Sequence, residues 1–208
     1  MGIGSKATAA PARRGRPGYD RDGVLAVAVQ LFNEQGYDAT SVSGLAERLG
    51  LTKSALYHHF SSKEELLAVA LEQALGGLEA VMTDAEALTG PAIERLRTVI
   101  RGASDVLVAQ LPSVTLLLRV RGNSAVEQHA LERRRRFDQQ VTALVAEAQR
   151  EGDVRDDVDA AVVARLIFGM INSVVEWYRP DGPVDETRLS HDILTVALDG
   201  LQPAARRG

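Results

Sequence analysis

Side chains suited to contact with DNA gather between residues 53 and 63. Lysine, serine, tyrosine and histidine donate hydrogen bonds to phosphate oxygens or base edges, and a small alanine among them permits close approach to a thymine methyl. Lys63 falls in the first turn of a predicted helix, where its ammonium and the helix amides would bind one phosphate together. We therefore expect DNA contacts from Lys53, Ser54, Ala55, Tyr57, His58 and Lys63.

Two short helices joined by a tight turn would present these side chains. Residues 41–60 read SVSGLAERLGLTKSALYHHF, with Ser41 and Thr52 as caps and Gly50 between two helical patterns. This is the layout of a helix-turn-helix, whose second helix enters the major groove. An ordinary helical hairpin has the same pattern, so the pattern alone leaves both interpretations open.

The sequence pattern in the rest of the chain predicts further helices and no β-sheet. Asp20 caps a first helix that ends at Gly36, and Ser62 with Glu65 forms a capping box for a long fourth helix. Helices are also expected at about 92–108, from 112, and at about 125–151, 158–178 and 185–201, without sustained strand alternation. We predict an all-α fold with a disordered basic arm (1–19), a helix-turn-helix domain (20–67) and a ligand-binding and dimerisation body (68–208).

Composition narrows the possible functions. The chain has no cysteine, which excludes disulfides, thiolate metal sites and cysteine nucleophiles. Residues 1–63 hold eight of the 24 basic and five of the 28 acidic residues, so a basic head precedes an acidic body, although chance scatter could produce so small an imbalance. No signal peptide is visible and the longest apolar run, 166–171, is too short to span a bilayer, so we expect a cytoplasmic protein with no membrane contact.

The stretch 20–67 resembles the DNA-binding domain of the TetR family of transcriptional regulators. The match is carried by Ala28, Leu31, Phe32, Gly36, Tyr37, Thr40, Leu45, Ala46, Gly50, Leu51, Lys53, Leu56, Tyr57, His59, Phe60, Lys63, Glu64, Leu66 and Leu67. The resemblance implies phosphate and base contacts from Thr40, Lys53, Ser54, Tyr57, His58 and Lys63, and core positions for Phe32, Leu56 and Phe60. Gly44 departs from the acidic or polar residue that is common early in the second helix of the family.

Three arginines in the N-terminal arm are further candidates. Arg13, Arg14 and Arg16 would enter a minor groove or lie near phosphates. A solvated arm that only raises nonspecific affinity explains them equally well.

The last two predicted helices carry apolar residues around most of their surface. In 158–178, valine, leucine, isoleucine, phenylalanine and methionine cover most of the circumference, so this helix is expected to be buried on more than one side. The resemblance implies that these two helices form a four-helix interface in a homodimer. A two-fold dimer binds a palindromic operator.

The body is expected to bind a small-molecule effector that moves the fourth helix and releases the repressor from DNA. The candidate contacts are Leu107, Leu111, Leu117, Arg119, Arg121, Arg133, Phe137, Phe168, Asn172 and Trp177. The arginines suit the phosphates of a coenzyme A thioester, and EWYRPDGPVDETRL resembles regulators of fatty-acid, steroid and aromatic-acid breakdown, several of which sense such esters. The apolar candidates could instead be ordinary core residues, and the arginines 133–136 could form a solvated helix face paired with acidic residues. The alternative function is a sensor of multiple drugs or of other apolar molecules that controls an efflux operon.

Other function classes have less support in the sequence. The sequence contains no nucleophile elbow, phosphate loop or zinc-binding histidine pair. We therefore expect that the protein is not an enzyme and that it has no cofactor and no metal site. His58 and His59 are adjacent and point in different directions; we expect His58 to face phosphate and His59 to pack within the head. A structural helical interaction protein is disfavoured by the basic head.

Overall fold

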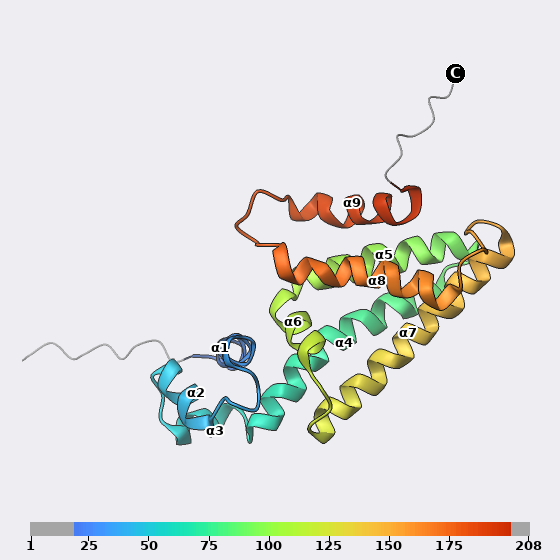
Figure 1. Ribbon diagram of the computed structural model, residues 1–208. Coiled ribbons are helices and arrows are strands. Elements are labelled where there is room, and N and C mark those ends of the chain that lie inside the picture. Colours follow the sequence, from blue (N-terminus) through green and yellow to red (C-terminus); the bar gives the residue numbers. More distant parts are fainter. Residues whose placement is uncertain (1–18, 201–208) are drawn as a thin grey trace, which may run out of the picture.

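The computed structural model describes residues 19–200, apart from the side chains of residues 186 and 187. Over that range the chain forms nine helices and no strand, which confirms the all-α prediction (Figure 1). The helices are α1 (Arg21–Gln35), α2 (Val42–Leu49), α3 (Lys53–His59), α4 (Lys63–Ala87), α5 (Ala92–Ala109), α6 (Leu111–Arg119), α7 (Ala125–Glu151), α8 (Ala160–Trp177) and α9 (Glu186–Asp199).

Helices α1 to α3 gather at one end of the molecule, and α4 runs from them into the rest of the chain (Figure 1). Their shared core consists of buried apolar side chains, among them Phe32, Leu56 and Phe60, each 2% exposed. The predicted boundary after residue 67 falls inside α4, so head and body share one continuous helix. The division into 20–67 and 68–208 therefore stays a prediction.

The turn between α2 and α3 depends on local capping. Gly50 has φ +65°, a left-handed conformation that glycine adopts without steric cost, and its amide donates to the carbonyl of Glu47. The hydroxyls of Ser41 and Thr52 accept from the amides of Gly44 and Ala55 at 3.0 and 3.1 Å. These caps fix where each short helix begins, and so which side chains of α3 face outward.

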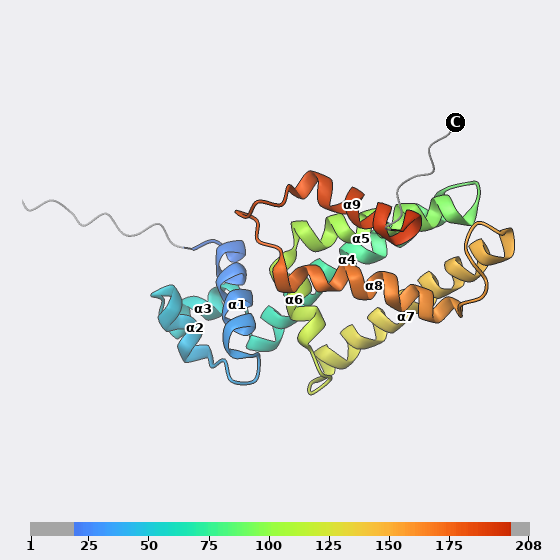
Figure 2. The ribbon, with the colours of Figure 1, turned by 45° about the horizontal axis from the view of Figure 1, so that its top comes forward.

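In the body, α4, α5, α7 and α8 pack against one another, and α9 lies beside α5 (Figure 2). The approach of α4 to α5 is close at Gly102, where an added Cβ would lie 2.7 Å from a methyl group of Val81. Helix α6 lies between the head and the body and contacts both α1 and α4.

Several helix boundaries differ by one or two residues from the sequence-based expectation, and one predicted cap differs as well. Helix α8 begins at Ala160 and not at 158, because the Asp159 carboxylate accepts from the amides of Ala161 and Val162. Helix α9 begins at Glu186 and ends at Asp199. In the predicted capping box, Ser62 accepts from the Glu65 amide, but the Glu65 carboxylate accepts from the amide and hydroxyl of Ser61 instead of reaching the Ser62 amide.

By length and composition alone, α4 and α8 would be long and apolar enough to cross a membrane. A packed helix of a water-soluble protein can have the same composition, and α4 buries eight side chains in the head and body. Composition is thus weak evidence for a membrane span.

Candidate DNA-binding surface and effector pocket

Helix α3 presents a polar outer face. Lys53, Ser54, Tyr57 and His58 are exposed, with Tyr57 50% exposed in spite of its large ring. On the inner side Leu56 is 2% exposed and packs in the head core. Ala55 and His59 are half-buried at the edges. The arrangement holds four hydrogen-bonding side chains on a short helix that cannot rotate without exposing its core residue.

Thr40 and Lys63 do not share this exposure, and their predicted contacts with DNA stay a prediction. Thr40 is 2% exposed and its hydroxyl donates to the carbonyl of Gly36 at 2.8 Å. The Lys63 ammonium donates to the carbonyls of Tyr37 and Thr40, both at 3.0 Å. It also lies 4.2 Å from the centre of the Tyr37 ring, a cation–π contact. In this conformation both side chains stabilise the loop before α2, because that loop offers carbonyl oxygens that need donors.

The arm residues Arg13, Arg14 and Arg16 lie outside the described residues. Their predicted contact with DNA stays a prediction.

A small apolar cavity lies among α4, α5, α6, α7 and α8. Of the predicted ligand residues, the structure brings five together there: Leu107, Leu117, Phe137, Phe168 and Asn172. The rings of Phe137 and Phe168 meet edge to face, with centroids 5.3 Å apart. The remaining wall residues are Leu78, Ala103, Val114, Leu118, Arg134, Asp138 and Ile171. The cavity measures about 40 Å³, which is space for one or two water molecules and not for a metabolite.

The other predicted ligand residues lie away from this cavity. The Arg133 guanidinium donates to both carboxylate oxygens of Glu79, at 2.8 and 2.7 Å, and also to Glu72. These hydrogen bonds raise the pKa of Arg133, and they lower the pKa of Glu79. Arg121 is exposed, and Trp177 is 50% exposed at the end of α8. Arg133 therefore joins α4 to α7, and none of these three residues lines the cavity.

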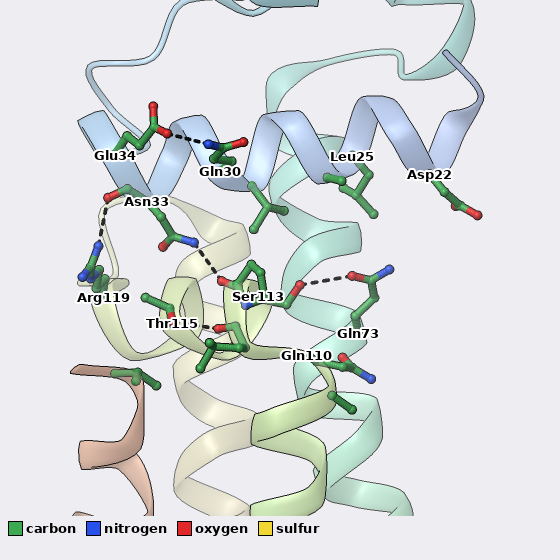
Figure 3. A pocket seen from close by; sticks show the side chains of 16 residues that line it. Asp22, Leu25, Gln30, Asn33, Glu34, Gln73, Gln110, Ser113, Thr115 and Arg119 are labelled. Carbon is green, nitrogen blue, oxygen red and sulfur yellow. Dashed lines mark hydrogen bonds between the residues drawn. The ribbon is translucent and has the colours of Figure 1, made fainter. Parts of the chain in front are cut away.

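Leu111 and Arg119 line a separate groove of about 820 Å³ between head and body (Figure 3). Across this groove the Asn33 amide donates to the carbonyl of Pro112 at 2.8 Å, and the Arg119 guanidinium donates to the carbonyl of Asn33 at 2.9 Å. A third bond runs from the Ser113 hydroxyl to Gln73 at 3.1 Å. Helix α6 is thus tied to α1 and α4 by polar contacts on one side and lines the apolar cavity on the other.

Large apolar side chains are exposed along α8 and α9. Leu166 is 67% exposed and Val162 41%, one turn apart on α8, and Val196 on α9 is 39% exposed. Gly169 continues the α8 row, and a Cβ added there would meet no atom within 4 Å. Such a surface is unusual on a chain that stays alone in water, and it marks a candidate protein interface.

Comparison with known families decides between the helix-turn-helix and the ordinary hairpin. Residues 24–70 match the family described as bacterial regulatory proteins, tetR family, and residues 89–201 match the tetracyclin repressor-like C-terminal domain. The chain belongs to the TetR family. The family resemblance of residues 20–67 is therefore confirmed, and the TetR match extends over the body as well.

Individual TetR-family proteins are similar over most of their length. The crystal structure of SCO3833 from Streptomyces coelicolor A3 is 49% identical, with a TM-score of 0.81 over 86% of this chain and 91% of that one. The transcriptional repressor KstR2 of Mycolicibacterium smegmatis is 26% identical over 200 residues, covering 92% of this chain and 95% of KstR2. AibR, solved with isovaleryl coenzyme A and operator DNA, is 24% identical with a TM-score of 0.70 over 86% of this chain and 97% of that one, which shows a shared fold. SCO3833 and KstR2 are described as a transcriptional regulator and a transcriptional repressor.

Proposed function

We propose that this TetR-family protein is a repressor that binds a palindromic operator as a homodimer and leaves it when a small effector enters the body. The observation that carries the proposal is the outer face of α3, where Lys53, Ser54, Tyr57 and His58 are exposed on a helix anchored by Leu56. Phosphate contacts from such side chains position a recognition helix, and contacts to base edges give it specificity.

The contacts with DNA are assigned to the α3 face and to its small residue Ala55. Thr40 and Lys63 have a supporting role in this proposal, since their polar atoms hold the loop that leads into α2. A DNA-binding regulator of this kind acts in the cytoplasm.

The homodimer is proposed to form through the exposed apolar row on α8 together with α9. Pairing Val162, Leu166 and Val196 with their copies would remove from water side chains that are 39–67% exposed. A two-fold axis would place the two α3 helices on half-sites one helical turn of DNA apart, about 34–36 Å.

The effector is proposed to bind in the apolar cavity and to act through α6. At about 40 Å³ the cavity has to expand to accept a metabolite. Val114 and Leu117 of α6 form part of its wall, while Pro112 and Arg119 of the same helix hold Asn33 of α1. An expansion of the cavity that shifts α6 would strain the hydrogen bonds from α6 to Asn33 in the head. The effector and the operator would then favour different conformations of the protein, so that binding of one would weaken binding of the other.

The proposed effector class is a coenzyme A thioester. The support is an apolar cavity with one arginine, Arg134, in its wall, together with the fold shared with AibR, which was solved with isovaleryl coenzyme A. A second candidate is a neutral apolar compound, as in a multidrug sensor that controls an efflux operon, because most of the cavity wall is hydrocarbon.

Operator binding can be tested by footprinting the purified protein on its own upstream DNA. The proposal expects a protected palindrome, affinity that falls steeply with salt, and loss of protection in Tyr57→Ala with an unchanged dimer mass. Protection that Tyr57→Ala leaves intact would remove the α3 face from the interface.

A further inference from the structure

The four arginines of α7 at 133–136 have different environments. Arg133 is held by Glu72 and Glu79, and its side chain is only 13% exposed. Arg135 and Arg136 are exposed. Arg134 is half-buried and lines the apolar cavity. Among the described residues its guanidinium makes no hydrogen bond or salt bridge.

The Arg134 guanidinium is not among the buried polar groups that lack a partner, so its donors are open to solvent as well as to the cavity wall. Free guanidinium donors bind carboxylates or phosphates with two parallel hydrogen bonds. The only other polar side chains in the cavity wall are Asp138 and Asn172. Asp138 lies one helical turn after Arg134, so the two share a face of α7.

Asp138 does not neutralise Arg134 by direct contact. Partial desolvation raises the pKa of the Asp138 carboxyl, and the positive charges of Arg134 and of Arg165 on α8 oppose this effect. The carboxyl therefore interacts with both arginines through space, without a salt bridge to either among the described residues. In the cavity wall itself Arg134 and Asp138 carry one charge each, and Arg165, which is exposed on α8 and does not line the cavity, adds a positive charge that acts on Asp138.

We propose that Arg134 anchors an anionic group of the effector, so that the effector is an apolar body carrying a carboxylate or a phosphate at one end. The apolar body occupies the cavity lined by Phe137 and Phe168 once that cavity has expanded, and the anion binds the guanidinium at the edge of the cavity. This inference rests on the proposed effector-binding function and assigns the head group to Arg134 in place of Arg119, Arg121 and Arg133. Asp138 opposes the anion and so limits its affinity.

Release of fluorescent operator DNA, together with calorimetric binding, tests the assignment. The probes are acyl-coenzyme A thioesters, free carboxylic acids and neutral alcohols with matched butanoyl, octanoyl and dodecanoyl chains, and free coenzyme A. Arg134→Gln should raise the half-release concentration of the anionic probes by roughly 10- to 100-fold, the range for loss of a charged hydrogen bond. Arg134→Lys should restore part of that loss, because it keeps the charge without the planar fork.

Arg135→Gln is the matched control, since it removes the same charge from an exposed position on the same helix. Arg135→Gln should leave the half-release concentrations unchanged. Asp138→Asn should strengthen the binding of the anionic probes alone. Thermal melting confirms that each variant is folded. Release by thioesters alone identifies a phosphate anion, and equal release by free acids identifies a carboxylate.

Four results would contradict the assignment or the proposals on which it rests. Equal responses of Arg134→Gln and Arg135→Gln to an anionic probe would remove Arg134 from the site. Release of the wild-type protein by the alcohols alone would refute the anionic class while leaving the proposed effector function in place. Failure of every probe to bind would refute both the class and the proposed cavity, and absence of operator binding by the wild-type protein would refute the proposed function itself.

Discussion

Replacing Arg133 by methionine tests whether this arginine supports the fold or binds the effector. Its guanidinium is largely buried and donates to Glu79 at 2.8 and 2.7 Å and also to Glu72, which joins α7 to α4. Hydrogen bonds between charged groups contribute about 1.5–3 kcal/mol each when well shielded. The two glutamate side chains are 43% and 61% exposed, so solvent screening reduces the sum, and we expect a loss of about 1–2 kcal/mol in the free energy of unfolding.

Thermal melting at neutral pH should then show a melting temperature lower by about 2–8 °C for Arg133→Met, with Arg135→Met unchanged. The difference should depend on pH. Because Arg133 lowers the pKa of Glu79 below its ordinary value of 4.5, its contribution is complete above that pH and is lost as the pH falls through the lowered pKa. A variant as stable as the wild type at pH 7, with weakened release by every probe, would refute the structural role and return Arg133 to the effector site.

Three further predictions address packing, assembly and DNA contact. Gly102→Ala should lower the free energy of unfolding by about 1 kcal/mol in chemical denaturation, because the clash with Val81 outweighs the gain in helix propensity. The control Gly76→Ala should not destabilise the protein, because its added Cβ meets only the end of a glutamate side chain. Equal effects of the two variants would contradict the close contact of α4 with α5. Leu166→Glu should convert the dimer to monomer in analytical ultracentrifugation while the melting curve stays cooperative, and an intact dimer would place the interface elsewhere. Lys53→Ala should reduce the salt dependence of operator binding by about one counterion, and an unchanged slope would show that this ammonium does not reach a phosphate.

Much of the head could be predicted from the sequence because its determinants are local. Helical spacing and caps place Leu56 inward and Tyr57 outward on any helix that begins after Thr52. Thr40 and Lys63 could not be placed in this way. The Lys63 ammonium meets carbonyl groups of a loop 23 and 26 residues earlier in the chain, and the sequence does not reveal where that loop folds back. The Thr40 hydroxyl donates to the carbonyl of Gly36 within the same loop.

In the body, the composition of α7 indicated an arginine cluster but not the role of each arginine. Arg133 and Arg134 both border the buried side of the helix, and only the position of α4 relative to α8 decides that one meets glutamates and the other the cavity. Leu111 and Arg119 show the same limit, because α6 turns them toward α1 and not toward Phe137. The sequence indicates that apolar residues surround most of α8, but which of them stay exposed in one chain, such as Leu166, depends on how α5 and α7 pack against that helix.

The most direct test of the central claim is fluorescence anisotropy of the wild-type protein and Tyr57→Ala on labelled upstream DNA, over a salt series and with and without the acyl-coenzyme A probes. We predict salt-sensitive binding to a palindromic site that the Tyr57→Ala dimer lacks, and loss of wild-type binding as an anionic probe is added. Binding that is insensitive to salt, or that the Tyr57→Ala dimer retains in full, would contradict operator recognition by α3.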